Sequence, residues 1–344
     1  MKFIRKLKRT FKFILYIFLL WIITFSVING SALKDIAAFG INSINYEQKS
    51  NDTISHNGNY KVLYDLAELN GEEQFGILDF MNVPNDSISK LNTNNKRMFY
   101  LMNYLDSIGV TYSSMSVPYK NVTNPTSNIF IKQGTKNEFV LITAHYDILF
   151  QNFRQYEGAL DNSGSVAVLL NVIQKVKSDL KDKNVAFLFT TEEEKGVIGA
   201  RRFVEYAKKQ NYKITKVICL DGVGRGNLAV MHNSKSGYGL VFRDLFFNWK
   251  LFTGSRFVNT PEFSEIDKTV IDFKKYNIKP LKSLVSSTDT RVFEAERIPS
   301  VHLTSDDIPH FLNVVHKFSD RIDGLHYNSL KQCEDVLCDF IYQL

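Results

Sequence analysis

Side chains that can bind a metal ion or move a proton follow three short apolar runs in the middle of the chain. Imidazole nitrogens and carboxylate oxygens are ligands of zinc, and the same groups act as general acids and bases. Because each of these groups stands where an apolar run stops, we interpret the three places together. The three runs and the residues that follow them are Phe139–Ala144 with His145-Tyr146-Asp147, Val185–Thr190 with Glu192-Glu193-Glu194, and Val217–Leu220 with Asp221.

The three runs are short and rich in Val, Ile and Phe, which is typical of buried parallel strands. Apolar residues at helical spacing predict helices between them, over Ser165–Leu180 and Val197–Lys209. This alternation predicts an α/β fold with a mostly parallel central sheet sandwiched between helices. Ligands bind such sheets at the carboxyl ends of the strands, where Asp161, in the loop before the first helix, can join the other groups.

The acidic residues at this edge predict bound cations. Without cations, the like charges of Asp161, Glu193, Glu194 and Asp221 would separate or take up protons. Two divalent ions would neutralise them, because one carboxylate can bridge two metals about 3.5–4 Å apart. Each metal would also take a nitrogen ligand, and His145 supplies only one, so a second histidine is needed. The candidates are His232, His302, His310, His316 and His326.

The start of the chain predicts contact with a membrane. The chain has 42 Lys and Arg against 36 Asp and Glu, and the six basic residues among the first twelve positions account for the excess. The remainder is neutral, so no nucleic-acid partner is expected. Phe13–Leu33 carries no charge and is just long enough to span a bilayer as a helix. The basic flank would keep its beginning in the cytoplasm and place the rest outside. Small residues at Gly30 and Ala32 leave a cleaved signal sequence, and therefore secretion, as the alternative.

The sequence divides into three regions. Residues 1–33 are the basic start with the anchor or signal sequence, 34–86 a stem or an extension packed on the main domain, and 87–344 one large domain. Within the last region, Asn128–Lys132 and Phe139–Ala144 are expected to be neighbouring strands around a turn at Gly134. The aromatic-rich stretch Tyr238–Phe257 is expected to form core and loops, and the three cysteines do not form a disulfide framework.

From about Asn94 to Leu330, the order and spacing of these residues resemble the co-catalytic zinc aminopeptidase family. That family includes bacterial leucyl aminopeptidases and, more distantly, glutamate carboxypeptidase and glutaminyl cyclase. One motif, Gly-Ala-x-Asp-Asn-x-Ser-Gly, is matched with one residue fewer. The matching segments are His145-Tyr146-Asp147, residues 158–164, residues 193–200, Asp221, Thr288-Asp289-Thr290, and His316 with Asp320 and Asp323.

The resemblance implies a zinc-exopeptidase (phosphorylase/hydrolase-like) fold and the hydrolysis of N-terminal residues from peptides with two zinc ions. It implies that Asp161 bridges the metals, that Glu193 is the general base and that Asp147 orients a ligand histidine. It also selects one of the five candidate histidines as the second nitrogen ligand. The implied zinc ligands are His145, Asp161, Glu194, Asp221 and His316.

Two positions depart from the family pattern, and two other functions stay open. Thr290 replaces the histidine of the Ser-Asp-His motif, and Val315 stands where many members have a tyrosine that helps to hold an oxyanion. One alternative is a glutaminyl cyclase-like acyltransferase with a single zinc, and the other is a non-catalytic, membrane-anchored binding ectodomain. The complete ligand set favours the peptidase, and a content of two, one or no zinc ions would distinguish the three.

Overall fold

The computed structural model describes residues 60–70, 92–118, 125–151, 155–233, 270–272, 274–283 and 288–344, together with positions 15, 16, 18, 19, 54, 58 and 153. The predicted anchor Phe13–Leu33 lies, apart from four positions, outside the described residues, and so does the aromatic stretch Tyr238–Phe257. Among the helices that are described, none is both long and apolar enough to cross a bilayer.

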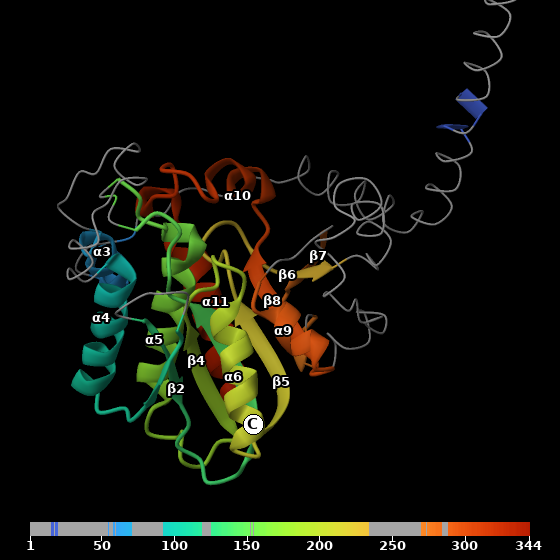
Figure 1. Cartoon of the computed structure of the whole chain (residues 1–344). Coiled ribbons are helices and arrows are strands. Elements are labelled where there is room, and N and C mark those ends of the chain that lie inside the picture. Colours follow the sequence, from blue (N-terminus) through green and yellow to red (C-terminus); the bar gives the residue numbers. More distant parts are fainter. Residues whose placement is uncertain are drawn as a thin grey trace, which may run out of the picture.

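In these parts of the chain, eight strands form one mixed sheet in the order β1-β2-β4-β3-β5-β8-β6-β7 (Figure 1). The four central strands β4, β3, β5 and β8 are mutually parallel, while β1, β2 and β6 join by antiparallel pairing. The strands are β1 (Ser113–Ser116), β2 (Ser127–Ile131), β3 (Glu138–His145), β4 (Val185–Thr190), β5 (Lys213–Leu220), β6 (Leu228–Asn233), β7 (Lys279–Ser283) and β8 (Ser300–Ser305).

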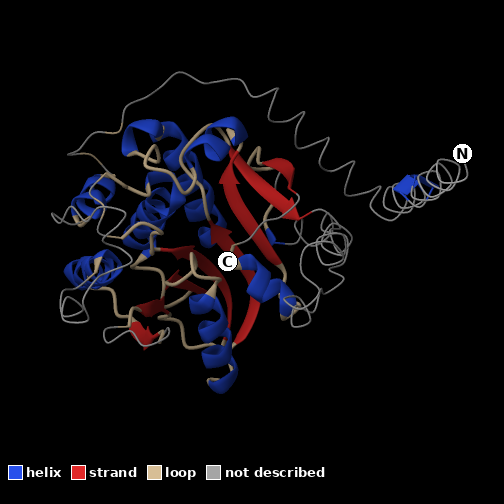
Figure 2. Cartoon of the chain, turned by 45° about the horizontal axis from the view of Figure 1, so that its top comes forward, coloured by secondary structure: helices blue, strands red, loops and turns tan. Residues whose placement is uncertain are grey.

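Helices cover both faces of the sheet (Figure 2). Successive β3 residues point to opposite faces, so Ile142 packs in the core beneath α5 and α11, whereas Leu141 packs beneath α6 and α9. The predicted sandwich of a largely parallel sheet between helices is therefore confirmed. The helices are α3 (Lys61–Glu68), α4 (Thr93–Ser107), α5 (Gly164–Val176), α6 (Ile198–Lys209), α9 (Thr290–Ala295), α10 (Ile308–Val314) and α11 (Tyr327–Tyr342), with short turns η3 (Ala159–Ser163) and η4 (Ile322–Gly324).

The order β3-α5-β4-α6-β5 is the predicted alternation of strand and helix. The expectation that β2 and β3 are neighbours is wrong, because β4 lies between them. Phe187 of β4 pairs with Ile131 of β2 on one side and with Ile142 of β3 on the other. A strand that is buried along its whole length, as β4 is, needs partners on both edges for its backbone groups, and the position between β2 and β3 supplies them.

Part of the region predicted as a stem or extension packs on the main domain. Tyr60, Leu63 and Leu66 at α3 are buried in the same core as α5 and α11. The Tyr60 hydroxyl donates a hydrogen bond of 2.8 Å to the buried carboxylate of Glu334 in α11. The division of the chain at residues 33 and 86 stays a prediction.

Candidate functional site

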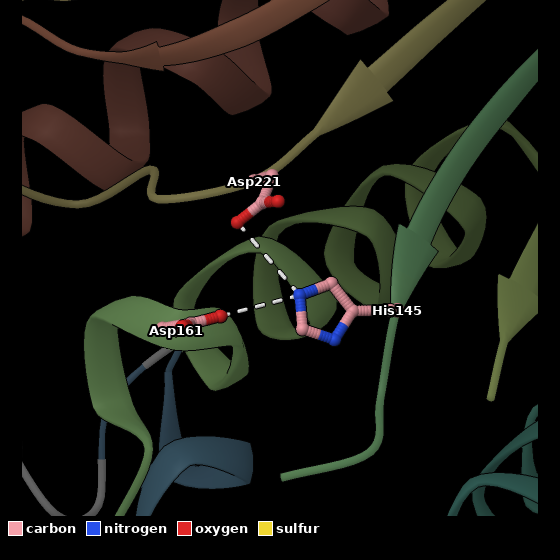
Figure 3. A group of neighbouring side chains, drawn as sticks. All are labelled: His145, Asp161 and Asp221. Atoms are coloured by element: carbon pink, nitrogen blue, oxygen red, sulfur yellow. Dashed lines mark ion pairs between the residues drawn. The ribbon is translucent and has the colours of Figure 1, made fainter. Parts of the chain in front are cut away.

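The polar groups singled out in the sequence lie together at the carboxyl edge of the sheet. His145 is the last residue of β3, Asp221 follows β5, and Glu194 follows β4. Asp161 lies in η3, directly before α5, and its carboxylate points toward the same ring nitrogen of His145 as the carboxylate of Asp221 does (Figure 3). The arrangement follows from the parallel strands, whose carboxyl ends meet at one edge.

Two groups of side chains share one carboxylate. Nε2 of His145 lies 3.2 Å from Oδ1 of Asp161 and 3.7 Å from Oδ1 of Asp221. Nε2 of His316 lies 3.2 Å from Oδ2 of Asp161 and 3.1 Å from Oε2 of Glu194. Within each group, the three possible ligand atoms lie within 4.8 Å of one another. Asp161 therefore offers one oxygen to each group.

Asp147 connects the histidine of the first group to the glutamates. Its Oδ1 lies 3.5 Å from Nδ1 of His145, so the opposite ring nitrogen faces the other carboxylates. The two carboxylate oxygens of Asp147 also accept hydrogen bonds of 3.2 Å from the backbone N–H groups of Glu193 and Glu194. The same ring nitrogen, Nδ1 of His145, lies 3.2 Å from the backbone oxygen of Asp147, so this residue contacts both the imidazole and the turn that follows β4.

The turn carrying Asp161 is held from both sides. The Asn162 side chain donates a hydrogen bond of 3.0 Å to the carbonyl oxygen of Leu220, at the end of β5. On the other side, the Asp320 carboxylate accepts hydrogen bonds of 2.7 Å and 3.0 Å from the backbone N–H groups of Leu160 and Asp161. The peptide bond between Asp161 and Asn162 is cis. These contacts set the direction of the shared carboxylate.

The three consecutive glutamates have different surroundings. Glu192 turns away from the site, since its carboxylate accepts a hydrogen bond of 3.1 Å from Thr126 and pairs with Lys195 at 2.7 Å. Glu194 belongs to the second group, whereas Glu193 is buried at the same edge and belongs to neither group. That the motif begins at Glu193, with Glu193 as the base and Glu194 as a ligand, stays a prediction.

The charges of the site act strongly on one another. Burial alone would lower the pKa of His145, but the carboxylates around its ring raise that pKa well above its usual value. Hydrogen bonds to Asp161 and Glu194 raise the pKa of His316 to about 10. Burial raises the pKa of Glu193 to about 10 and that of Glu194 to about 7. The two glutamates and the two imidazoles thus favour their protonated forms, whereas hydrogen bonds to His145 and His316 outweigh burial and lower the pKa of Asp161. The field of the site attracts positive charge.

The donor atoms fit zinc. Two ligands that each lie about 2.1 Å from a tetrahedral zinc ion are about 3.4 Å apart. The nitrogen–oxygen separations in the two groups are 3.1–3.7 Å. In the described part of the chain, Nε2 of His145 and Oε1 of Glu194 are also buried without a hydrogen-bond partner, which is unfavourable unless a further group binds them.

Of the five candidate histidines, His316 is the one that the described side chains bring into a group. Nε2 of His302 lies 2.9 Å from the backbone oxygen of Asp221, beneath the site, and His302 belongs to neither group. His310 is half-buried at the start of α10, and His326 precedes α11. The side chain of His232 lies outside the described residues.

Thr290 and Val315, the two departures from the family pattern, lie in or beside short helices. The Thr290 hydroxyl lies 2.8 Å from the hydroxyl of Thr288, and both threonines are buried. Between them, Asp289 is buried and its carboxylate accepts a hydrogen bond from Thr190 at the end of β4. Val315 directly follows α10 and precedes His316.

Sequence reasoning missed Arg97. This fully buried residue of α4 donates hydrogen bonds of 2.7 Å to the backbone oxygen of Tyr146 and 2.9 Å to the Ser163 hydroxyl. Burial lowers its pKa to about 10. The sequence could have indicated this burial, because Arg97 directly precedes Met98, which belongs to the apolar face of the helix. Arg97 joins the segment after β3 to the turn that carries Asp161.

Comparison of the sequence with known proteins identifies a matching family and several similar proteins. A model of peptidase family M28 matches residues 128–341. A vacuolar membrane protease of Yarrowia lipolytica is 26% identical over 122 residues, which are 33% of this chain and 12% of that protein. Aminopeptidase YwaD of Bacillus subtilis is 33% identical over 111 residues, which are 30% of this chain and 24% of that protein. The aligned part is therefore a quarter or less of the length of these relatives.

Solved structures share the fold at low sequence identity. LapA of Legionella pneumophila superposes with a TM-score of 0.59 at 14% identity, covering 84% of this chain and 73% of that chain. A glutaminyl cyclase of Bacteroides thetaiotaomicron, bound to N-acetylhistamine, gives a TM-score of 0.57 at 15% identity, covering 86% of this chain and 100% of that chain. At these identities the likeness shows a common fold.

Proposed function

The chain belongs to peptidase family M28, and from that premise we propose that it is a zinc-dependent aminopeptidase that removes N-terminal residues from peptides. The observation that carries the proposal is that the Asp161 carboxylate is shared between the two groups of ligand atoms. Each of its oxygens faces a different imidazole, His145 on one side and His316 on the other. A carboxylate with an imidazole and a second acid on either side is the arrangement expected for a bridged pair of metal ions.

In this proposal, the residues have separate tasks. His145 and Asp221 would hold one zinc ion, Glu194 and His316 would hold the other, and Asp161 would offer one oxygen to each. Bound zinc lowers the pKa of water and polarises a carbonyl oxygen. Glu193, which belongs to neither group, accepts the proton of the attacking water and passes it to the leaving amine. Asp147 keeps the His145 ring in the orientation that presents Nε2 to the site.

A glutaminyl cyclase-like acyltransferase is the second candidate, because a glutaminyl cyclase superposes almost as well as LapA. A cyclase with one zinc would use one group of ligands. The residues here form two complete groups around Asp161, and this favours the two-zinc peptidase.

Metal content measured beside turnover tests the function. The purified full chain is expected to contain two zinc ions and to release the N-terminal residue from a panel of aminoacyl chromophores. A chelator should remove the activity, zinc should restore it, and N-acetylated versions of the same substrates should stay intact. One zinc ion with cyclisation of N-terminal glutamine would instead establish the cyclase. Absence of both zinc and turnover would point to a binding ectodomain.

We also propose that the protein is anchored in a membrane with the site on the extracytoplasmic side. The basic start and the uncharged stretch 13–33 support an N-terminus in the cytoplasm. Fractionation combined with protease treatment of intact cells tests this location. The full-length protein is expected in the membrane fraction and accessible to the protease. A shortened, secreted form would indicate signal cleavage, and a soluble form protected inside intact cells would contradict the proposal.

A further inference from the structure

A cavity of about 600 Å³ lies outside the two groups of ligand atoms. Its walls come from three segments, which are α3 with Asn70 after it, Glu157 before η3, and residues 321–323 at η4. The volume falls within the roughly 300–1,000 Å³ of pockets that bind small organic molecules. The proposed hydrolysis gives none of the residues that line this cavity a task.

Hydrogen bonds and an ion pair join the walls of the cavity to one another. The Glu157 carboxylate accepts a hydrogen bond of 2.7 Å from the backbone N–H of Ile322 and pairs with the Arg321 guanidinium at 3.1 Å. The Asn70 side-chain amide donates a hydrogen bond to the backbone oxygen of Tyr156, which directly precedes Glu157. A ligand would therefore meet walls that are already in place, which lowers the cost of binding.

Asn70 supplies a buried acceptor to the cavity that it lines. The residue is only 2% exposed. Its amide nitrogen faces the carbonyl oxygen of Tyr156, so the other end of the amide, Oδ1, is the acceptor. Within the described ranges of the chain, this oxygen is buried and has no hydrogen-bond partner. A buried oxygen in this state favours a ligand that donates a hydrogen bond.

The charges around the cavity favour a cation. The Arg321 guanidinium lies 3.1 Å from the Glu157 carboxylate and 4.0 Å from that of Asp323, so one positive charge meets two acids. Glu68 adds a third carboxylate, and the walls carry an excess of negative charge. An ammonium group combines positive charge with three N–H donors. A metal ion fits less well, because these acids do not form a group of possible metal ligands in the described part of the chain.

We propose that this cavity is a second binding site, for a small organic molecule that carries a primary ammonium group. The ammonium would donate a hydrogen bond to Oδ1 of Asn70 and be attracted by the carboxylates of Glu68 and Asp323. Free amines and the lysine side chains of peptides both offer this group. The site goes beyond the proposed function, because it uses no zinc ligand.

Calorimetric titration of the zinc-loaded full chain tests the site with probes that differ in one group. Pentylamine, pentanol and pentanoate share the same alkyl chain and end in an ammonium, a hydroxyl and a carboxylate. The amine should bind saturably, whereas the alcohol and the carboxylate should not bind. The amide of Nα-acetyl-lysine presents the ammonium from a peptide backbone. If it binds as well, the site accepts lysine side chains, and if only pentylamine binds, the site is restricted to free amines.

Variants of the lining residues place the binding in the cavity. Asn70→Leu removes the buried acceptor and should weaken pentylamine binding by at least about tenfold, because hydrogen bonds to charged groups are among the stronger ones. Glu68→Gln and Asp323→Asn should each weaken it by about two- to fivefold, as expected for exposed ion pairs. Both acids are exposed, so these two variants keep the test decisive if Asn70→Leu does not fold.

Glu205→Gln is the matched control, because Glu205 is an exposed acid of α6, on the other face of the sheet from α3. It should bind pentylamine as the wild type does. His316→Ala should also keep the binding, which separates the cavity from the zinc site. The inference is overturned if no ammonium probe binds, if the cavity variants bind pentylamine like the wild type, or if His316→Ala loses the binding instead.

Discussion

Glu193→Gln is expected to lower turnover by at least about 10²–10⁴-fold, the usual contribution of a general base. The substitution keeps the size and shape of the side chain and removes its ability to accept a proton. Because Glu193 belongs to neither group of ligand atoms, both zinc ions and the fold should remain. The measurement is zinc stoichiometry beside the steady-state parameters, and the loss should fall on kcat while KM changes little.

Glu194→Gln is the neighbouring comparison. Glu194 lies 3.1 Å from the His316 ring and faces Asp161 in the second group. Its substitution should weaken one zinc site, and excess zinc should restore part of the activity. The opposite pattern, with zinc lost from Glu193→Gln and retained in a slower Glu194→Gln, would exchange the two roles. The register of the glutamate motif would then have to move by one residue.

His316→Ala is expected to have the second-largest effect. The imidazole pairs with both Asp161 and Glu194 at 3.1–3.2 Å, so its removal takes the only nitrogen donor from that group. Removal of an outer partner of a ligand already lowers metal affinity or activity by about 10–100-fold, and removal of a ligand should exceed this range. Zinc analysis should find one ion in place of two, with turnover reduced accordingly.

His310→Ala is the control on the same segment of chain. His310 begins α10, belongs to neither group of ligand atoms, and is only half-buried. At the start of the helix, the backbone N–H of His310 donates a hydrogen bond of 3.0 Å to the Asp307 carboxylate, which alanine would keep. The variant should therefore retain both zinc ions and full turnover. Loss of zinc from His310→Ala, with none from His316→Ala, would show that the second nitrogen ligand has been misassigned.

The sequence by itself determined the structural features that depend on residues close together in the chain. Apolar runs of Val, Ile and Phe predicted β3, β4 and β5, and helical spacing predicted α5 and α6, because these patterns express local backbone preference and burial. The position of His145 and Asp221 at strand ends could also be read directly. Parallel strands end at one edge, so the meeting of these groups followed from the predicted fold class.

Only the tertiary structure decided which distant side chains meet. The residues alone left five histidines as candidates for the second nitrogen ligand, and the family resemblance selected His316. Nε2 of His316 lies 3.2 Å from the Asp161 carboxylate because the segment after α10 packs against the edge of the sheet. The insertion of β4 between β2 and β3, and the burial of Arg97 beneath Tyr146, likewise depend on long-range packing. Local sequence determines which backbone conformations are favourable. The contacts named here join segments far apart in the chain. Whether such segments meet depends on how the helices and the sheet pack together and on the need to give buried polar groups partners.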